Sequence, residues 1–133
     1  MRSRPHHPPV SQREVELILV RQLASYLTLP IFVVDLKGTL IYFNEPAEPF
    51  LGVRDDETGD LLLDEWVAAL APTDEQGAAL EAGMLPLVRA LKEQRPRSGR
   101  IWANGQPIDV TACPLSGQAG RDLGAVGLYW SKT

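Results

Sequence analysis

The stretch IFVVDLKGTLIYFN, residues 31–44, constrains the fold more than any other part of this sequence. Two apolar runs, rich in β-branched and aromatic residues, flank the tetrad DLKG. Asp at the first turn position and Gly at the fourth favour a type I turn followed by a left-handed residue, which links antiparallel strands. We therefore expect a β-hairpin with strands at residues 31–35 and 39–43.

Asn44 ends this hairpin and predicts the start of a short helix. Its side chain can accept a hydrogen bond from a free backbone N–H of the first helical turn. Pro49 keeps that helix short, because a proline ring collides with the carbonyl group four residues earlier. Gly52 is expected to end the helix in a left-handed conformation. The hairpin is therefore followed by one short helical connection.

An N-terminal helix, assigned to residues 11–28, precedes the hairpin. Ser11 and Glu14 form a capping box at its start, and Pro30 follows its end. Its apolar residues cover an arc of about 200°, roughly twice the width of a core-facing stripe. One side of the arc can cover the sheet. We expect the other side to form the interface of a homodimer, through Val15, Leu19, Leu23 and Tyr26.

The remainder of the chain alternates between helical and extended patterns. Residues 61–70 look helical, and Pro86 is expected to open another helix that reaches Gln94. Asn104-Gly105 is a strong hairpin signal between strands at residues 99–103 and 106–115. A last strand is expected at residues 123–130. This order of strands, short helices and strands predicts an antiparallel α+β domain without a parallel crossover.

Composition excludes several classes of protein. The chain has 133 residues, 44% of them hydrophobic, which suits one domain with one core. A net charge of −4 argues against partners such as nucleic acid or an anionic membrane surface. The lone Cys113 cannot form an internal disulfide, and no apolar stretch approaches the ~20 residues of a membrane span. We expect a soluble cytoplasmic protein, with residues 1–10 (MRSRPHHPPV) forming a disordered arm.

In the order and spacing of these motifs, the chain resembles the PAS sensory domains from about Leu27 to its end. The resemblance rests on the strand IFVVD, the turn at Gly38, the strand ending at Asn44 and the one-turn helix closing on FLG, residues 50–52. It continues in the strand ending CPL, residues 113–115, and in LGAV, residues 123–126, which opens the last strand. Each motif alone is loose, but together they cover about three quarters of the chain.

The resemblance implies a PAS-like domain over residues 29–133, with a five-stranded antiparallel sheet and short helices over one face. It also implies that the first hairpin and the helix after it form a wall and the rim of a small cavity. The candidate lining residues for a small apolar ligand are Phe43, Phe50, Leu51, Trp66, Leu91 and Trp102. The alternative is that these side chains simply fill the core, and the sequence does not separate the two.

Cofactors of the family can be compared with this sequence. Haem-binding members are similar in using a histidine on the helix before the second hairpin, and light-sensing flavin members need a cysteine in that segment. Residues 53–94 contain neither His nor Cys. We therefore expect neither haem nor covalently bound flavin. Cys113, on an expected strand, is interpreted as a small apolar residue of the sheet, with a redox role as the alternative.

Candidate catalytic and metal-binding residues are sparse. The acidic runs at residues 55–57, 64–65 and 74–75 are interpreted as a solvated surface, because catalytic carboxylates need a desolvated pocket. No histidine lies in the domain to activate a nucleophile. His6 and His7 lie in the arm, where two adjacent histidines make a poor metal site. We expect no catalytic residue and no metal site.

One departure from the family concerns the end of the chain. Many PAS domains end in an Asp-Ile-Thr signature before a signalling helix, whereas here Ser131, Lys132 and Thr133 occupy those positions. Either a separate protein provides the output, or the chain is a piece of a longer one. Two functions stay open: a ligand-binding sensory module that regulates a partner protein, and a ligand-free dimerisation or docking module.

Overall fold

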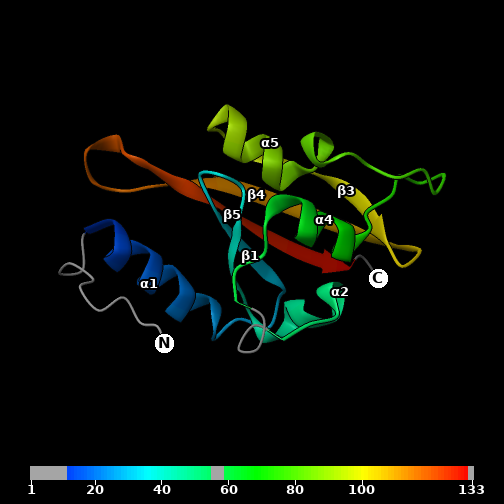
Figure 1. The fold of residues 1–133 in the computed structure, drawn as a ribbon, viewed down its shortest axis with the longest axis horizontal. Coiled ribbons are helices and arrows are strands. Elements are labelled where there is room, and N and C mark those ends of the chain that lie inside the picture. The colour runs from blue at the N-terminus through cyan, green and yellow to red at the C-terminus, as the bar shows by residue number, and fades with distance from the viewer. Residues whose placement is uncertain (1–11, 55–58, 132–133) are drawn as a thin grey trace.

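Five antiparallel strands form the sheet around which the chain is built (Figure 1). The structure is a computed structural model that describes residues 12–54 and 59–131. The strands lie in the order β2-β1-β5-β4-β3, so that β2 and β3 are the two edges. Their bounds are Ile31–Asp35 for β1, Leu40–Phe43 for β2, Arg97–Ala103 for β3, Gln106–Ser116 for β4 and Asp122–Ser131 for β5. The predicted fold class is confirmed.

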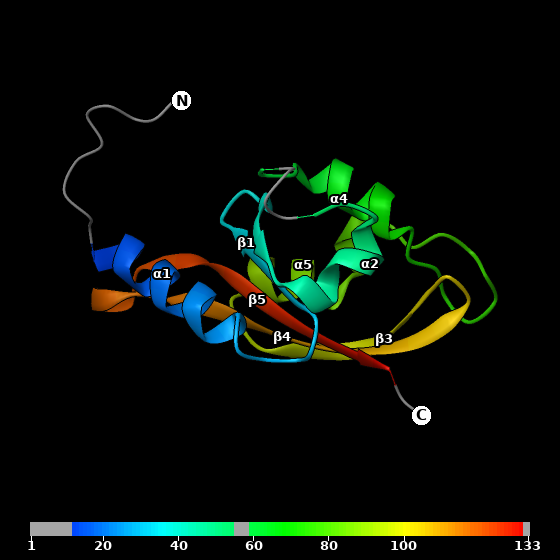
Figure 2. The same ribbon diagram turned by 90° about the horizontal axis from the view of Figure 1, so that it is seen from below.

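Short helices connect the two halves of the sheet. They are the 3-10 turn η1, Glu45–Ala47, then α2, Glu48–Leu51, α4, Leu63–Leu70, the turn η2, Ala82–Met84, and α5, Pro86–Glu93. A further turn, η3, Gln118–Gly120, joins β4 to β5. The N-terminal helix α1, Gln12–Ala24, lies apart from α2, α4 and α5, beside the end of the β4–β5 hairpin (Figures 1 and 2).

The first hairpin has the turn that the sequence predicts. The Asp35 side chain accepts hydrogen bonds from the backbone N–H groups of Lys37, at 2.9 Å, and Thr39, at 3.0 Å. Gly38 has φ +85°, a left-handed conformation that glycine adopts without steric cost. The predicted helix stop is also confirmed, because Gly52 ends α2 with φ 73°.

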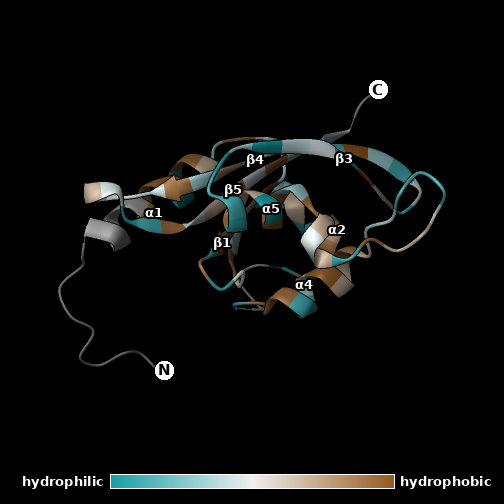
Figure 3. Cartoon of the chain, turned by 90° about the horizontal axis from the view of Figure 1, so that it is seen from above, coloured by the Kyte–Doolittle hydropathy of each residue, from teal (hydrophilic) through white to brown (hydrophobic). Residues whose placement is uncertain are grey.

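The two faces of the sheet are covered by different elements. Alternating side chains of a strand point to opposite faces, so Phe32 and Val34 join an inner cluster with residues of α2, α4 and α5. Ile31 and Val33 face the other way and pack with Ala24 of α1. Figure 3 shows hydrophobic residues on the helices α2, α4 and α5 that flank the strands. The short helices therefore cover the inner face, and α1 covers part of the outer face.

The helix α1 is shorter than the sequence predicts. It ends at Ala24, and the next turn is held by hydrogen bonds from Tyr26 N to Leu23 O and from Leu27 N to Ala24 O, both 3.1 Å. These bonds span three residues instead of the four of an α-helix, so the last turn is wound more tightly than the helix before it.

The strand β3 begins at Arg97, two residues earlier than expected.

The contact between β1 and β5 requires a glycine at position 124. Gly124 pairs with Asp35 and has φ +152°, and a Cβ atom there would lie 2.0 Å from the carbonyl oxygen of Val34. No side chain fits without moving β1 away from β5. The LGAV motif thus contains a glycine because the backbones of β1 and β5 approach each other closely at this position.

We predict that Gly124→Ala lowers the free energy of unfolding by at least about 3 kcal/mol, because the methyl group meets backbone that cannot move aside. Chemical denaturation followed by circular dichroism measures the change. Gly83→Ala is the matched control, since nothing lies within 4 Å of the added atom. Equal stability of the two variants would contradict this account of Gly124.

Candidate functional site

The structure brings five of the six candidate cavity residues to the inner cluster. Phe43, Leu51, Trp66 and Leu91 are buried members of this cluster, and Phe50 packs against it while partly exposed. They come from the strand β2 and from the helices α2, α4 and α5, which cover one face of the sheet. These five side chains therefore lie in one cluster, although they come from positions spread between 43 and 91.

The sixth candidate, Trp102, lies elsewhere. Its neighbours Ile101 and Ala103 are buried, Ile101 pairs with Ile108 of the inner cluster, and alternation places the Trp102 side chain on the opposite face. Its backbone pairs with Thr73 at the free edge of β3. Trp102 is therefore separated by the sheet from the other five residues.

Three aromatic rings occupy the centre of the inner layer. The rings of Phe32 and Tyr129 stack with their centroids 4.5 Å apart, and Trp66 meets Phe32 edge-on at 6.0 Å. The indole N–H of Trp66 donates a hydrogen bond of 2.9 Å to the carbonyl of Gly38. Stacked and edge-on pairs are both favourable aromatic geometries. This arrangement ties α4 to the turn of the first hairpin.

Sequence reasoning did not single out Phe32 or Tyr129. Both lie on strands whose alternation could have placed them inside. Tyr129 lies two positions from Gly127 on the same face, and a Cβ atom at Gly127 would come within 3.0 Å of the Tyr129 ring. Because Gly127 has no side chain, the Tyr129 ring has room to lie against Phe32. Phe32 is the residue of β1 that pairs with Gly127 of β5.

The hydroxyl group of Tyr129 is the unusual feature of this layer. The residue is 2% exposed, and burial raises the pKa of its phenol above the usual value. Its backbone N–H bonds to Pro30, but within residues 12–54 and 59–131 its hydroxyl has no hydrogen-bond partner. A buried unpaired hydroxyl costs about 1–3 kcal/mol. A water molecule or a small ligand would relieve that cost.

Asn44 does not cap the helix that follows it, and the sequence-based prediction of its role is wrong. Its side chain makes no hydrogen bond to η1. Instead its carbonyl oxygen accepts a bond of 2.9 Å from the N–H of Ile31, and its amide donates to the carbonyls of Leu29, at 2.8 Å, and Ala24, at 3.2 Å. The Asn44 side chain is therefore bound by the end of α1, the linker and the start of β1, and not by η1.

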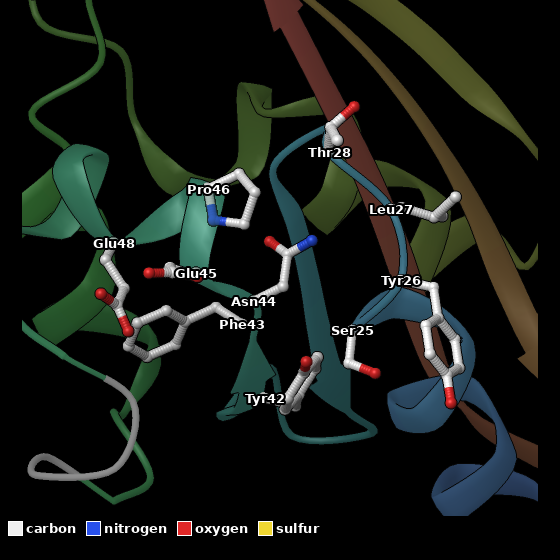
Figure 4. A pocket seen from close by; sticks show the side chains of 10 residues that line it. All are labelled: Ser25, Tyr26, Leu27, Thr28, Tyr42, Phe43, Asn44, Glu45, Pro46 and Glu48. Atoms are coloured by element: carbon white, nitrogen blue, oxygen red, sulfur yellow. The ribbon is translucent and has the colours of Figure 1, made fainter.

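A groove of about 530 Å³ surrounds this amide (Figure 4). The linker residues 25–28 form one wall, and residues 42–46 together with Glu48 form the other. In the close-up, Asn44 lies between Ser25 and Thr28 on one side and Glu45 and Pro46 on the other. The groove therefore follows the junction between α1 and the helices of the inner layer.

The outward side of α1 remains apolar and exposed. Ala24 is buried against the sheet, with Leu17 and Val20 packed beside it. Of the expected interface residues, Leu19 is 57%, Leu23 63% and Tyr26 77% exposed. The fourth, Val15, lies outside the side chains that the structure describes. The division of the apolar arc between the sheet and the exterior is as the sequence predicts.

The charged residues offer no assembled catalytic centre in the part of the chain that the structure describes. Asp64 and Glu65 are exposed on α4. Among residues 12–54 and 59–131, no group of three or more His, Cys, Asp or Glu side chains could hold a metal ion. His6 and His7 lie outside the described residues. Cys113 is partly exposed on β4, opposite Val126 of β5.

Within residues 12–54 and 59–131, no helix is both long and apolar enough to cross a bilayer.

Comparison with solved structures identifies the fold. The PAS domain of BvgS from Bordetella pertussis is 20% identical, with a TM-score of 0.65 over 90% of this chain and 88% of that one. This chain has the PAS fold. The PAS domain of nitrogen regulation protein NR(II) from Vibrio parahaemolyticus is 17% identical, with a TM-score of 0.55 over 86% and 98% of the two chains. A PAS domain from Colwellia psychrerythraea is 19% identical, with a TM-score of 0.52 over 88% and 97%.

Comparisons of sequence are less informative for this PAS-fold domain. No family model matches the chain. No curated protein matches it either. The similarity therefore lies in the three-dimensional arrangement of the sheet and its helices, with few residues in common.

We predict that Asn44→Ala lowers the free energy of unfolding by about 2–4 kcal/mol, because it leaves the N–H of Ile31 and the carbonyl of Leu29 without this partner and removes one of the two hydrogen bonds that the carbonyl of Ala24 accepts. Denaturant titration measures the loss, and amide hydrogen exchange should show faster exchange at Ile31. Gln106→Ala, at an exposed position of β4, is the control and should change stability by less than about 0.5 kcal/mol. A loss in Asn44→Ala no larger than in the control would contradict the role assigned to this amide.

Proposed function

We propose that this PAS-fold domain is a non-catalytic signalling module that forms a homodimer and regulates a separate output protein. The observation that carries the proposal is the apolar, exposed side of α1 and of the linker after it. Nine large hydrophobic side chains in the described residues are exposed, and six of them lie between positions 18 and 29: Ile18, Leu19, Leu23, Tyr26, Leu27 and Leu29.

Such a cluster of exposed hydrophobic side chains is typical of a protein–protein interface. Single exposed hydrophobic residues are normal on a protein surface, but a contiguous patch usually marks a binding partner. A second copy of the chain presents the same apolar stripe, and a twofold axis would let each α1 cover the other. Leu19 and Leu23 lie one helical turn apart and would form the centre of that contact.

The hydrogen bonds of Asn44 supply a route from this interface to the inner layer. Its amide holds the end of α1 and the linker on one side, and its backbone carbonyl accepts a hydrogen bond from Ala47 N in η1 on the other. A shift of η1 and of α2, which follows it, would therefore also move the end of α1. Signalling through a packed element of this kind needs two arrangements that partners can bias.

No cofactor is part of the proposal. Residues 53–94 contain neither the histidine that would hold haem nor the cysteine that would bind flavin covalently. The exposed carboxylates of α4 are surface charges, and no nucleophile with a neighbouring base is assigned. The domain is proposed to act through binding alone.

A second candidate function is the recognition of a small molecule in the inner layer. Trp66, Phe32 and Tyr129 pack closely, which favours a core filled by the protein itself. The unpaired hydroxyl of Tyr129 favours an occupant that accepts or donates one hydrogen bond. This candidate would make the module a sensor rather than a docking domain alone.

We predict that Leu19→Glu converts the dimer to a folded monomer. Burying a charge in an apolar contact costs at least about 2 kcal/mol, which weakens association about 30-fold. Sedimentation velocity over a range of concentrations measures the shift, and circular dichroism checks that the variant remains folded. Met84→Glu is the matched control, since Met84 is 59% exposed, close to the 57% of Leu19, but lies in η2.

A wild-type protein that sediments as a monomer at the highest concentration, or a Met84→Glu variant that dissociates as readily as Leu19→Glu, would contradict the proposed interface.

We predict that a neutral aromatic fragment with one carbonyl group raises the melting temperature of the wild-type protein more than that of Tyr129→Phe. A ligand that binds only the folded state stabilises it, and the variant lacks the hydroxyl that would donate to the carbonyl. Differential scanning fluorimetry measures both proteins, with the matching hydrocarbon as control fragment. Absence of any shift, together with an unliganded mass in native mass spectrometry, would leave the docking module as the function.

A further inference from the structure

The first half of β3 has an open backbone edge. Trp102, in its second half, exchanges two hydrogen bonds with Thr73: its N–H donates to Thr73 at 2.9 Å, and the N–H of Thr73 donates to Trp102 at 2.8 Å. Both backbone groups of Trp102 therefore point away from β4. In an antiparallel strand every second residue points the same way, and the register between β3 and β4 has no shift.

Ser98 and Arg100 consequently present their backbone N–H and C=O groups to this free edge. Both residues are exposed. Across residues 12–54 and 59–131, no backbone group outside the β3–β4 ladder bonds to either of them. Figure 3 shows the beginning of β3 as hydrophilic and its next part as hydrophobic. The edge is thus covered at Trp102 and available at the two positions before it.

The chain itself indicates what kind of segment fits there. Antiparallel continuation of the pairing between Thr73 and Trp102 would place Glu75 opposite Arg100. The chain turns away before that, because Asp74 accepts hydrogen bonds from the N–H groups of Gln76 and Ala78. The pKa of Arg100 is raised chiefly by its hydrogen bond to Asp109, and the Glu75 carboxylate adds to the shift. An acidic residue is therefore already favoured beside the edge.

The charge around the edge is complementary to an acidic partner. Between positions 89 and 100 the chain carries five basic residues and one acidic residue. Glu93 pairs with Arg89 and Arg97, and Asp109 pairs with Arg100. The remaining two, Lys92 and Arg95, are exposed and have no ion pair in the described part of the chain.

The outer face beside the edge also has room for a side chain. A hollow of about 380 Å³ lies there, lined by Ser98, Arg100, Asp109, Trp130 and their neighbours. A strand paired with β3 points every second side chain toward this face. An apolar residue of an incoming strand could therefore lie against Trp130 while its backbone pairs with the edge.

We propose that the open edge of β3 at Ser98 and Arg100 is a docking site for an extended acidic segment of a partner protein, which adds a strand to the sheet. Backbone hydrogen bonds would provide affinity and the basic residues would select for acidic sequences. The site lies on the opposite edge of the sheet from β2 and is independent of the α1 interface.

The test uses a fluorescein-labelled peptide of alternating threonine and glutamate, with binding followed by fluorescence anisotropy. Two control peptides accompany it: one with lysine in place of glutamate, and one with N-methyl groups that block backbone pairing but keep the charge. We expect the acidic peptide to bind, both controls to bind at least about tenfold more weakly, and added salt to weaken binding.

Protein variants locate the site. Ser98→Pro removes the outward N–H while leaving the bonds to β4, because proline is tolerated where the N–H faces solvent. We expect it to weaken binding about tenfold and Arg95→Glu to weaken it by a similar factor. Lys37→Glu, an exposed charge reversal at the first hairpin, is the control and should bind as the wild type does.

Four results would overturn the proposal: no binding of the acidic peptide, equal binding of either control peptide, unchanged binding by Ser98→Pro, or tighter binding of a single-stranded oligonucleotide. Sedimentation of the wild type and of each variant shows separately whether the proposed α1 interface forms. Failure at β3 is thereby distinguished from failure of the proposed dimer.

Discussion

The buried side chain of Asn44 joins the parts of this molecule that signalling would have to connect. Its three hydrogen bonds reach the end of α1, the linker and the first residue of β1, while its backbone begins η1. All three partners are backbone groups, and a buried backbone group is costly to leave without a hydrogen bond. The amide therefore fixes where α1 leaves the sheet, and through it which side of α1 faces outward.

The central sheet then separates two kinds of surface. Its inner face is occupied by the stacked rings of Phe32 and Tyr129 with Trp66 across them, which join the helices to the sheet. In the described residues, its outer face packs against Ala24, Leu17 and Val20 of α1, while Ile18, Leu19 and Leu23 of that helix are exposed.

The two candidate functions use different parts of the molecule: binding of a small molecule would use the inner layer, and docking of other proteins would use the surface. The hydroxyl of Tyr129, which has no hydrogen-bond partner among the described residues, is a feature of the inner layer that packing does not explain, and it is the reason to test for a small ligand. The exposed stripe of α1 and the open edge of β3 lie on different parts of the surface. A dimer and a separate partner could therefore be bound at the same time, without competition for one site.

The sequence by itself determined the elements and much of their order. The turn at residues 35–38, the short helix ended by Gly52 and the apolar surplus of α1 all follow from local patterns, because turn chemistry and helical periodicity act over a few residues. Phe43, Leu51, Trp66 and Leu91 were also found as inner residues from the resemblance.

Tertiary structure decided the rest. Trp102 lies on the other face because the register of β3 is set by its pairing with β4. Asn44 binds a linker far from it in sequence instead of its own helix. The Tyr129 ring is buried against Phe32 only because β5 pairs with β1. Each of these depends on which distant segments meet, and local pattern carries no information about that.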